Sequence, residues 1–299
     1  GQKNVPKQWA RNRFNLLWEA VDKVCRETGT HTIMHGGDIF DRVPTPEEVG
    51  IMLDMFDRLK DYTHIVYAGN HEATSKHKSF WEEFSALEAD GNITLIHEFT
   101  ELEPGVHVLP YTDLKKKDWH GTEGRILFTH VRGEIPPHVK PEIDLDLFNT
   151  WDKVFAGDLH ARSNSQRNIY YPGSPITTSF HRSESSNENG CYIVDTCTMV
   201  HEFIEFKLPQ LIRRTVDNPD DMVQSDYHHT IYELLGDATE LATVGANDLL
   251  DKKIISRDSE ATLQLKDMTM EEELLIYLTE VEKLNKPEEV VEEYVNIKN

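Results

Sequence analysis

The sequence predicts an α/β fold, with a large first domain and a smaller second one. Over the first two thirds of the chain, helical hydrophobic patterns alternate with short β-rich runs, which is typical of α/β sheet domains. After Gly190 two strand patterns follow each other closely, as in an antiparallel pair. With 299 residues, of which 38% are hydrophobic, the chain is long enough to bury a full core.

Helices are expected where apolar side chains recur at helical spacing between residues that start or stop a helix. Gly29 and Gly91 each end one such segment, and Pro46 begins another. The expected helices cover residues 9–28, 46–59 and 78–90, with a short helical link over residues 143–150.

Short runs rich in β-branched and aromatic residues separate these helices and predict the strands. The strands are expected within residues 30–41, 62–73, 92–99, 106–111, 125–131 and 151–161, and in the later pair 191–196 and 199–206.

The last third of the chain is expected to form a separate part. Pro209 begins a stretch with Pro, Asp and Asn turn residues, which is typical of a domain boundary. Residues 210–265 have only a weak α+β pattern. Near the end, Thr269 and Glu272 are placed as a capping box ahead of an apolar stripe, so residues 268–284 are expected to form a helix.

The charge balance restricts what this chain can bind by itself. With 31 basic and 53 acidic residues the formal net charge is −22 at pH 7, which disfavours a protein that coats DNA. Any DNA binding would be local, through cations, a few placed basic side chains or a more basic partner.

The sequence shows no apolar stretch near the roughly 20 residues of a membrane span and no leader pattern, so we expect a cytoplasmic protein without a membrane partner. Its three cysteines lack metal-type spacing and are expected to be free thiols.

Four of the expected strands end, at their carboxyl side, in polar residues of types that bind metal ions. Because the carboxyl ends of strands form the ligand crevice of α/β sheets, these side chains are expected to converge. Neighbouring glycines would let the backbone turn tightly beneath a metal. One such motif alone is a common turn, but the ordered set predicts a metal site. The residues are Asp38, Asn70, His71, His130, Asp158 and His160.

This ordered set resembles the signature of the calcineurin-like metallophosphoesterases, which runs D-x-H, G-D-x-x-D, G-N-H-D/E, H and G-H-x-H. The second to fifth blocks correspond here to GDIFD, GNHE, the histidine of FTHV (His130), and GDLH. The resemblance covers residues 1–208. It implies a calcineurin-like β-sandwich flanked by helices, with a two-metal phosphoesterase site.

Within that superfamily the sequence is similar to the SbcD-type nuclease subunits of DNA repair and recombination complexes, phage recombination endonucleases included. The segments GDIFDRVPTP and YYPGSPITTSF are similar to that branch. The resemblance implies a nuclease domain over residues 1–208, a small α+β capping and DNA-binding domain over 209–265, and a C-terminal helical partner-binding segment over 266–299. It also implies an SMC-like ATPase partner and a homodimer through the helices at 46–59 and 78–90, which together give a heterotetramer.

The resemblance assigns metal-binding roles to the matching residues. Asp38 would bridge two divalent ions, Asn70 and His130 would bind the second ion, and His160 the first. Mixed nitrogen and oxygen ligands favour manganese, with magnesium as the alternative. Two such ions can stabilise both the attacking and the leaving oxygen of a phosphate ester.

The resemblance also assigns residues that would act on the substrate. His71 would stand beside the scissile phosphate, steadying charge or protonating the leaving oxygen, and Asp41 and Glu72 would orient His71 and the ligands. Arginines near the ligand-bearing loops could grip DNA phosphates, although each could equally be an ordinary surface residue. These are Arg42, Arg132, Arg162 and Arg182, with Arg167 beside them.

Two departures from the family signature affect the metal site. Asp158 stands where the family usually has the first histidine of G-H-x-H, and because a carboxylate still binds hard divalent ions, we expect it to be a working ligand. No D-x-H block precedes GDIFD in the sequence. In relatives a glycine closely follows that motif, and Gly1 opens this sequence. We therefore expect that the first strand, with D-x-H, is missing from it.

The sequence thus predicts a metal-dependent DNA exonuclease or endonuclease that hydrolyses phosphodiester bonds as a subunit of an SMC-like ATPase–nuclease complex in recombination, repair or replication. Two alternatives stay open. One is a dimetal phosphatase or nucleotide phosphodiesterase, which the long segment after residue 208 disfavours. The other is a non-catalytic DNA-binding scaffold subunit, which the presence of His71, His130 and His160 disfavours.

Overall fold

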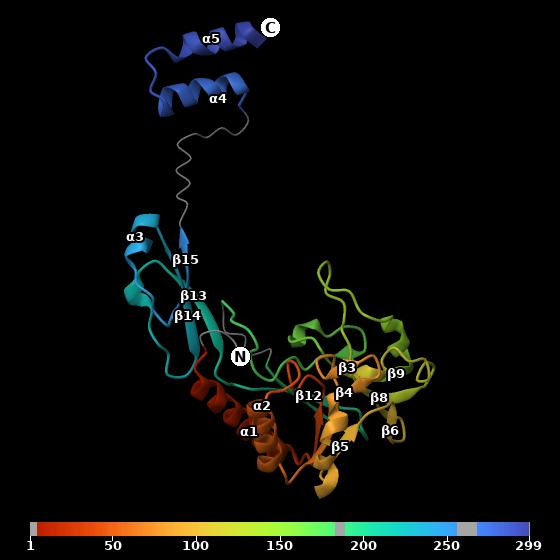
Figure 1. Cartoon of the computed structure of the whole chain (residues 1–299). Coiled ribbons are helices and arrows are strands. Elements are labelled where there is room, and N and C mark those ends of the chain that lie inside the picture. Colours follow the sequence, from red (N-terminus) through yellow and green to blue (C-terminus); the bar gives the residue numbers. More distant parts are fainter. Residues whose placement is uncertain (1–4, 183–188, 256–267, 299) are drawn as a thin grey trace. The chain divides into compact units, whose positions relative to one another are not determined.

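The chain divides into two compact units, shown with the course of the polypeptide in Figure 1. The structure is a computed structural model that describes residues 5–182, 189–255 and 268–298. Unit 1 comprises residues 1–214 and 223–231, and unit 2 comprises residues 215–222 and 232–299.

Unit 1 contains two stacked sheets. The first has the strand order β1-β2-β5 and is parallel throughout, and the second has the order β10-β9-β8-β7-β6, in which β6 is antiparallel to its neighbour. The strands are β1 (Thr32–His35), β2 (Thr63–Tyr67), β5 (Ile93–Ile96), β6 (Thr100–Glu103), β7 (Val106–Leu109), β8 (Gly124–His130), β9 (Trp151–Gly157) and β10 (Ile169–Tyr170).

One hydrophobic core lies between these two sheets. Every second side chain of the middle strands points into it, because side chains alternate between the two faces of a sheet. Its buried members are Tyr67, Ile96, Val106, Val108, Ile126, Phe128 and Phe155. The remaining apolar side chains of the second sheet, such as Leu127 and Val154, pack on its other face against Trp119 and Phe148 from the connecting segments. The result is the mixed α/β sandwich that the sequence predicts.

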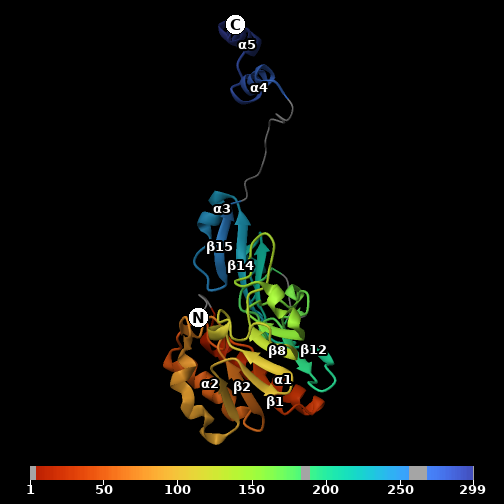
Figure 2. The same ribbon diagram turned by 90° about the vertical axis from the view of Figure 1, so that its right-hand side faces the viewer.

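Two helices cover the outer face of the first sheet. They are α1 (Lys7–Thr28) and α2 (Pro46–Arg58), and Figure 2 labels them beside β1 and β2. Trp18 of α1 packs with Leu59 just after α2, whereas Phe56 of α2 packs against the first sheet. Gly29 ends α1 with a left-handed φ of 68°, which confirms the predicted stop.

The third expected helix differs from its prediction. Residues 78–79 form strand β4, which pairs with β3 (Ala73–Ser75), and the rest is a 3-10 helix, η1 (Phe80–Asp90), with a non-helical kink at Phe84. Successive residues of an α-helix point about 100° apart. The tighter, kinked winding instead lets Phe80, Trp81 and Phe84 all pack in one aromatic cluster.

A predicted antiparallel hairpin completes unit 1. Strands β11 (Gly190–Val194) and β12 (His201–Glu205) pair as expected. Phe206 beyond the hairpin packs with Val24, so the side of α1 turned away from α2 contacts this region. Short 3-10 helices lie in the connections, namely η2 (Tyr111–Asp113), η3 (Leu145–Thr150) at the predicted helical link, and η4 (Arg162–Asn164).

A three-stranded sheet follows the hairpin. It consists of β13 (Leu211–Val216), β14 (His229–Gly236) and β15 (Leu250–Ile255), with η6 (Pro219–Asp221) before β14 and α3 (Ala238–Thr243) before β15.

Farther along the chain, α4 (Met270–Ile276) begins at the predicted capping box of Thr269 and Glu272 and continues as a π-helical turn, η7 (Tyr277–Val281). A second helix, α5 (Pro287–Lys298), lies within the expected helical segment 266–299 but beyond the helix expected at 268–284. None of the helices in the described residues has the length and apolar character needed to cross a membrane.

Candidate metal centre

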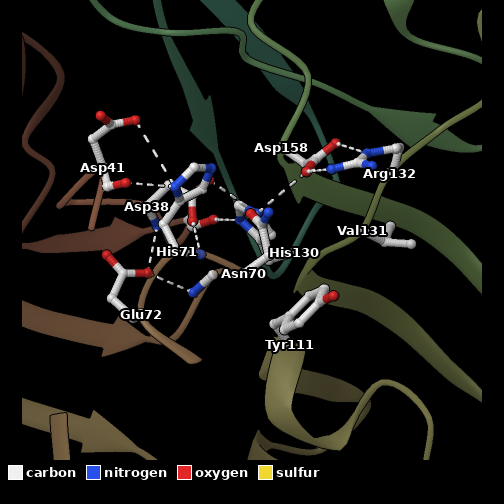
Figure 3. Close-up of polar contacts among 12 residues, drawn as sticks. Asp38, Asp41, Asn70, His71, Glu72, Tyr111, His130, Val131, Arg132 and Asp158 are labelled. Atoms are coloured by element: carbon white, nitrogen blue, oxygen red, sulfur yellow. Dashed lines mark hydrogen bonds and ion pairs between the residues drawn. The ribbon is translucent and has the colours of Figure 1, made fainter. Parts of the chain in front are cut away.

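The candidate centre lies where four strands of the two sheets end. The parallel register pairs His35 with Val66 in the first sheet and His130 with Gly157 in the second. Asp38 and Asn70 follow the ends of β1 and β2, and Asp158 follows β9. Figure 3 shows these side chains turned toward one another, as strand ends at one edge of a sheet allow.

His130 is at the middle of the cluster and is fully buried. Its Nε2 lies 3.4 Å from Asp38 Oδ2 and 3.8 Å from Asp158 Oδ1. Asn70 reaches the same point, because a terminal atom of its amide lies 3.0 Å from His130 Nε2 and 3.0 Å from Asp38 Oδ2. One carboxylate, one imidazole and one amide therefore converge on a single position.

The imidazole of His130 is oriented by the backbone. Its Nδ1 lies 2.8 Å from the carbonyl oxygen of Gly36, which only accepts, so Nδ1 donates and Nε2 faces Asp38. Burial disfavours the charged imidazolium, but the carboxylate of Asp38 outweighs that cost and raises the pKa of His130. Burial likewise disfavours an ionised Asp38, but hydrogen bonding and charge from His130 and His71 together outweigh it and lower the pKa of Asp38. His130 and Asp38 are thus arranged so that a positively charged imidazole and a negatively charged carboxylate stabilise each other.

The donor set fits a divalent cation. With its NH₂ group turned toward the cluster, the Asn70 amide donates to both His130 Nε2 and Asp38 Oδ2, each at 3.0 Å. With the amide turned the other way, Asn70 Oδ1, Asp38 Oδ2 and His130 Nε2 would present the oxygen and imidazole ligands that a divalent metal ion takes. Within the described ranges no three His, Cys, Asp or Glu side chains stand as a preformed metal site, and here Arg132 engages the carboxylate of Asp158.

Glycines leave room for this convergence. A Cβ atom at Gly37 or at Gly157 would lie 2.6 Å from His130 Nδ1, and one at Gly69 would overlap the carboxylate of Asp38. Gly37 also has a φ of 84°, which favours glycine. The backbone of three turns therefore approaches the His130 and Asp38 side chains closely because these turns have no side chain there.

Glu72 links the turn after β1 to the turn after β2. Its side chain is buried and accepts backbone N–H groups from Asp38 and Gly69, both at 2.8 Å, and from Phe40 at 3.0 Å. Burial raises the pKa of Glu72, and the three N–H donors oppose that effect. Glu72 thus supports the turn after β1 and the turn after β2, in the supporting position expected from sequence.

His71 lies on the open side of the cluster. Its backbone N–H donates to Asp38 Oδ1 at 3.1 Å, and its Nδ1 lies 2.6 Å from the backbone carbonyl oxygen of Asp41. The side chain is 42% exposed, whereas the carboxylate of Asp41 is 87% exposed. The contact of Asp41 that orients His71 is therefore its main-chain carbonyl, and Nε2 of His71 remains on the solvent side, 3.9 Å from Asp38 Oδ2.

Asp158 forms an ion pair with Arg132, as the dashed lines in Figure 3 show. The carboxylate is only 7% exposed, and its two oxygens lie 3.2 and 3.4 Å from Nε and Nη2 of Arg132. Hydrogen bonding to Asp158, together with the charge of that carboxylate, raises the pKa of the Arg132 guanidinium. Arg132, expected to contact DNA, is instead engaged by a candidate metal ligand.

The other candidates lie apart from this cluster. His160 is exposed and its Nδ1 lies 3.1 Å from Thr178 Oγ1; among the described residues it makes no hydrogen bond or ion pair with Asp38, His130 or Asp158. Of the arginines, Arg42 bonds Glu48 at 3.0 Å, Arg162 stacks on Phe203 and Arg182 is exposed.

Sequence reasoning missed two residues that border the cluster. The Tyr111 ring lies edge-on to His130, with centroids 6.1 Å apart, and its hydroxyl donates to Glu142 at 2.9 Å. Glu142 also accepts the backbone N–H of Arg132 at 3.2 Å. Tyr111 follows the end of β7, so the strand-end rule, applied to one more strand, would have found it. No local pattern marks Glu142.

The order of these motifs matches a known family. The family model for calcineurin-like phosphoesterases matches residues 10–187, which include every member of the cluster. The chain belongs to this family.

A relative supports the same assignment over nearly the whole length. The chain is 41% identical over 295 residues to a protein of Escherichia phage T5 described as "Probable exonuclease subunit 1", covering 95% of this chain and 90% of that protein. Calcineurin-like phosphoesterases use divalent metal ions, and the cluster of Asp38, Asn70 and His130 lies inside the matched family region. The predicted family is confirmed.

Proposed function

We propose that this chain is the nuclease subunit of a DNA-processing complex that hydrolyses phosphodiester bonds in recombination, repair or replication. The observation that carries the proposal is the convergence of Asp38, Asn70 and His130 on one position where a cation fits. The phosphoesterase family and the relative named as an exonuclease subunit support a phosphodiester as substrate.

The residues present define how metal ions would be held. Asp38 would bridge two ions, Asn70, His130 and Asp158 would bind one of them, and His160 would bind the other. When bound, two divalent ions neutralise phosphate charge and activate water for in-line attack. Carboxylate, amide and imidazole donors favour manganese, with magnesium as the alternative. Asp158 would exchange Arg132 for the ion, which frees the guanidinium for a substrate phosphate.

His71 is placed to act on the substrate itself. The Asp41 carbonyl accepts from Nδ1, so Nε2 is directed to the open side of the cluster, where a phosphate would lie. From that position Nε2 can steady charge on the phosphate or give a proton to the leaving oxygen. The carboxylate of Asp41 is exposed and is not directed to that side, so substitution of Asp41 should lower the rate of cleavage far less than substitution of His71.

Partners are proposed from the relative's name and from exposed apolar side chains. A subunit implies at least one other protein, and we propose an SMC-like ATPase. The helices after residue 268 expose apolar side chains that such a partner could cover, among them Met270, Tyr277, Val281, Leu284 and Val290. Leu53, 45% exposed on α2, supports a homodimer through that helix and η1.

The decisive experiment measures cleavage by the full-length protein, with the partner ATPase present in a parallel series. Labelled linear duplex DNA, single-stranded DNA and an aryl phosphate are incubated with manganese, magnesium or EDTA. We expect DNA cleavage in manganese, none in EDTA, and a loss of about 10²-fold or more in His71→Ala. The matched control is His97→Ala, because His97 is an exposed histidine outside the cluster.

Each other outcome identifies an alternative. Hydrolysis of the aryl phosphate alone would indicate a phosphatase, and silence on every substrate would indicate a DNA-binding scaffold. Equal activity of the His71→Ala and His97→Ala proteins would remove His71 from the chemistry.

A further inference from the structure

A pocket separate from the metal-binding cluster lies beside β10, the edge strand of the second sheet. Its volume is about 390 Å³, and it is open to solvent. Side chains from η4, β10 and the β11–β12 hairpin form its walls. They are Arg162, Tyr170, Tyr192, His201 and Phe203, together with two serines.

The walls are aromatic. Tyr170 and His201 have ring centroids 4.4 Å apart, and the Tyr192 ring lies 5.5 Å from His201 and 5.4 Å from Phe203. These rings line one continuous surface between the sheet edge and the hairpin. A planar, unsaturated ring is the kind of ligand that such a surface stacks against.

The charged groups at the pocket are positive. The Arg162 guanidinium lies 4.4 Å from the Phe203 ring centroid, and Lys153 bonds His201 Nδ1 at 2.8 Å. None of the described residues that line the pocket is acidic. In a chain of net charge −22, a pocket lined by an arginine, aromatic rings and two serines selects for an anion that also has a flat face.

The pocket is joined to the candidate centre by the chain itself. Arg162 follows His160 closely on the loop after β9. Tyr170 pairs in parallel with Phe155, two positions before the end of β9 at Gly157. At about 3.3 Å per residue, Tyr170 therefore lies only roughly 7 Å, measured along the strand direction, from the end of β9 that Asp158 follows.

We propose that this pocket binds an unpaired nucleobase of the DNA strand that is held at the metal centre, a proposal that rests on the nuclease function above. The base would stack on the aromatic wall, and Arg162 would contact the adjoining phosphate while keeping its stack on Phe203. A base in a duplex has both faces covered by its neighbours, so the pocket favours a frayed or single-stranded end.

The test measures base contact without cleavage. The full-length protein in EDTA is irradiated with a single-stranded oligonucleotide carrying one 5-iodouracil, and the cross-linked peptide is identified by mass spectrometry. We expect a cross-link at Tyr170, Tyr192 or Phe203. Phe203→Leu and Arg162→Ala should each lower the cross-link yield about fivefold or more. Fivefold is the lower end of the loss in affinity expected when one base–aromatic stack is removed.

The controls separate this proposal from a folding effect and from loss of charge. Arg58→Ala removes an arginine that lies 5.4 Å from the Trp18 ring, in a similar cation–aromatic pair outside the pocket, and should leave the yield unchanged. Thermal melting of each variant shows that it is folded. A cross-link elsewhere, an equal yield with the same label in blunt duplex DNA, or an unchanged yield in both pocket variants would overturn the proposal.

Two further outcomes are distinguishable. Suppression of the cross-link by low concentrations of thymidine monophosphate would assign the pocket to a free nucleotide product and overturn a strand-bound base. Because the cross-link needs no metal, a protein that cross-links at the pocket but fails to cleave DNA in manganese would contradict the nuclease function and leave the base pocket standing.

Discussion

Asp158 meets two local constraints at once. Its carboxylate is 7% exposed and paired with Arg132, and its backbone φ is 93°. Positive φ is uncommon outside glycine, and Asn and Asp tolerate it best among the other residues. An aspartate in place of the family's usual histidine therefore suits the turn and brings a negative charge to His130.

The first prediction tests whether Asp158 is a ligand. Asp158→Asn keeps the shape and the tolerance for positive φ, but it removes the charge and frees the Arg132 guanidinium beside the site. We expect manganese affinity to fall about tenfold or more, measured from the free Mn²⁺ signal in electron paramagnetic resonance. Asp152→Asn, on the exposed start of the same strand, is the control. Equal affinities of the two variants would exclude Asp158 as a ligand.

The second prediction concerns the space beside Asp38. In Gly69→Ala the new Cβ overlaps the Asp38 carboxylate, so the turn or the ligand has to move. We expect a decrease of about 1–3 kcal/mol in the free energy of unfolding, measured in urea, together with weaker manganese binding. Gly50→Ala offers the contrast, because Gly50 lies in α2 with open space and alanine favours helix by up to about 1 kcal/mol. Similar effects at both glycines would contradict the overlap.

The site was predictable to the extent that strand ends determine it. Asp38, Asn70, His130 and Asp158 each follow an apolar run, and the parallel register brings them together. The partner of Arg132 could not be predicted, because a guanidinium after a strand can face a substrate or a carboxylate, and the sequence does not distinguish the two. Glu142 joins the site only through the tertiary path of its loop.

At the scale of elements, the strongest local signals were start and stop residues. The side chain of Thr45 accepts the N–H of Glu48, and Glu48 accepts the N–H of Thr45 at 2.7 Å, so α2 begins with a complete capping box. Gly29 ends α1 for a comparably local reason. The winding of η1 was not predictable, because two of its aromatic rings, Phe80 and Trp81, pack on Phe40 from another segment.

The third prediction removes the cap of α2. Thr45→Ala should lower the free energy of unfolding by about 1 kcal/mol, because the backbone N–H of Glu48 loses its partner. For a unit of this size that corresponds to a decrease of about 2–4 °C in Tm, measured by calorimetry. Thr45→Ser keeps the hydroxyl and should remain near the wild-type value. A loss in the serine variant as large as in the alanine variant would mean that methyl packing, and not capping, stabilises this end.

At the scale of the whole molecule, charge dominates. A net charge of −22 repels DNA, so binding by this chain alone depends on a few basic side chains. Without metal Arg132 stays paired with Asp158, so if Arg42, Arg162 and Arg182 each neutralise one phosphate, affinity should fall roughly 40-fold between about 50 and 200 mM salt. Fluorescence anisotropy in EDTA measures this slope. Tight binding that does not change with salt would contradict the proposed contacts.

The buried carboxylate of Glu72 has a consequence for how the centre is assembled. It accepts N–H groups from the turn after β1 and from the turn after β2, so folding alone orders both turns. The entropy cost of ordering them is then part of the folding equilibrium and is not subtracted from the affinity for a cation. The scaffold is preorganised, and repeated loss and return of metal would leave the geometry of the two turns unchanged.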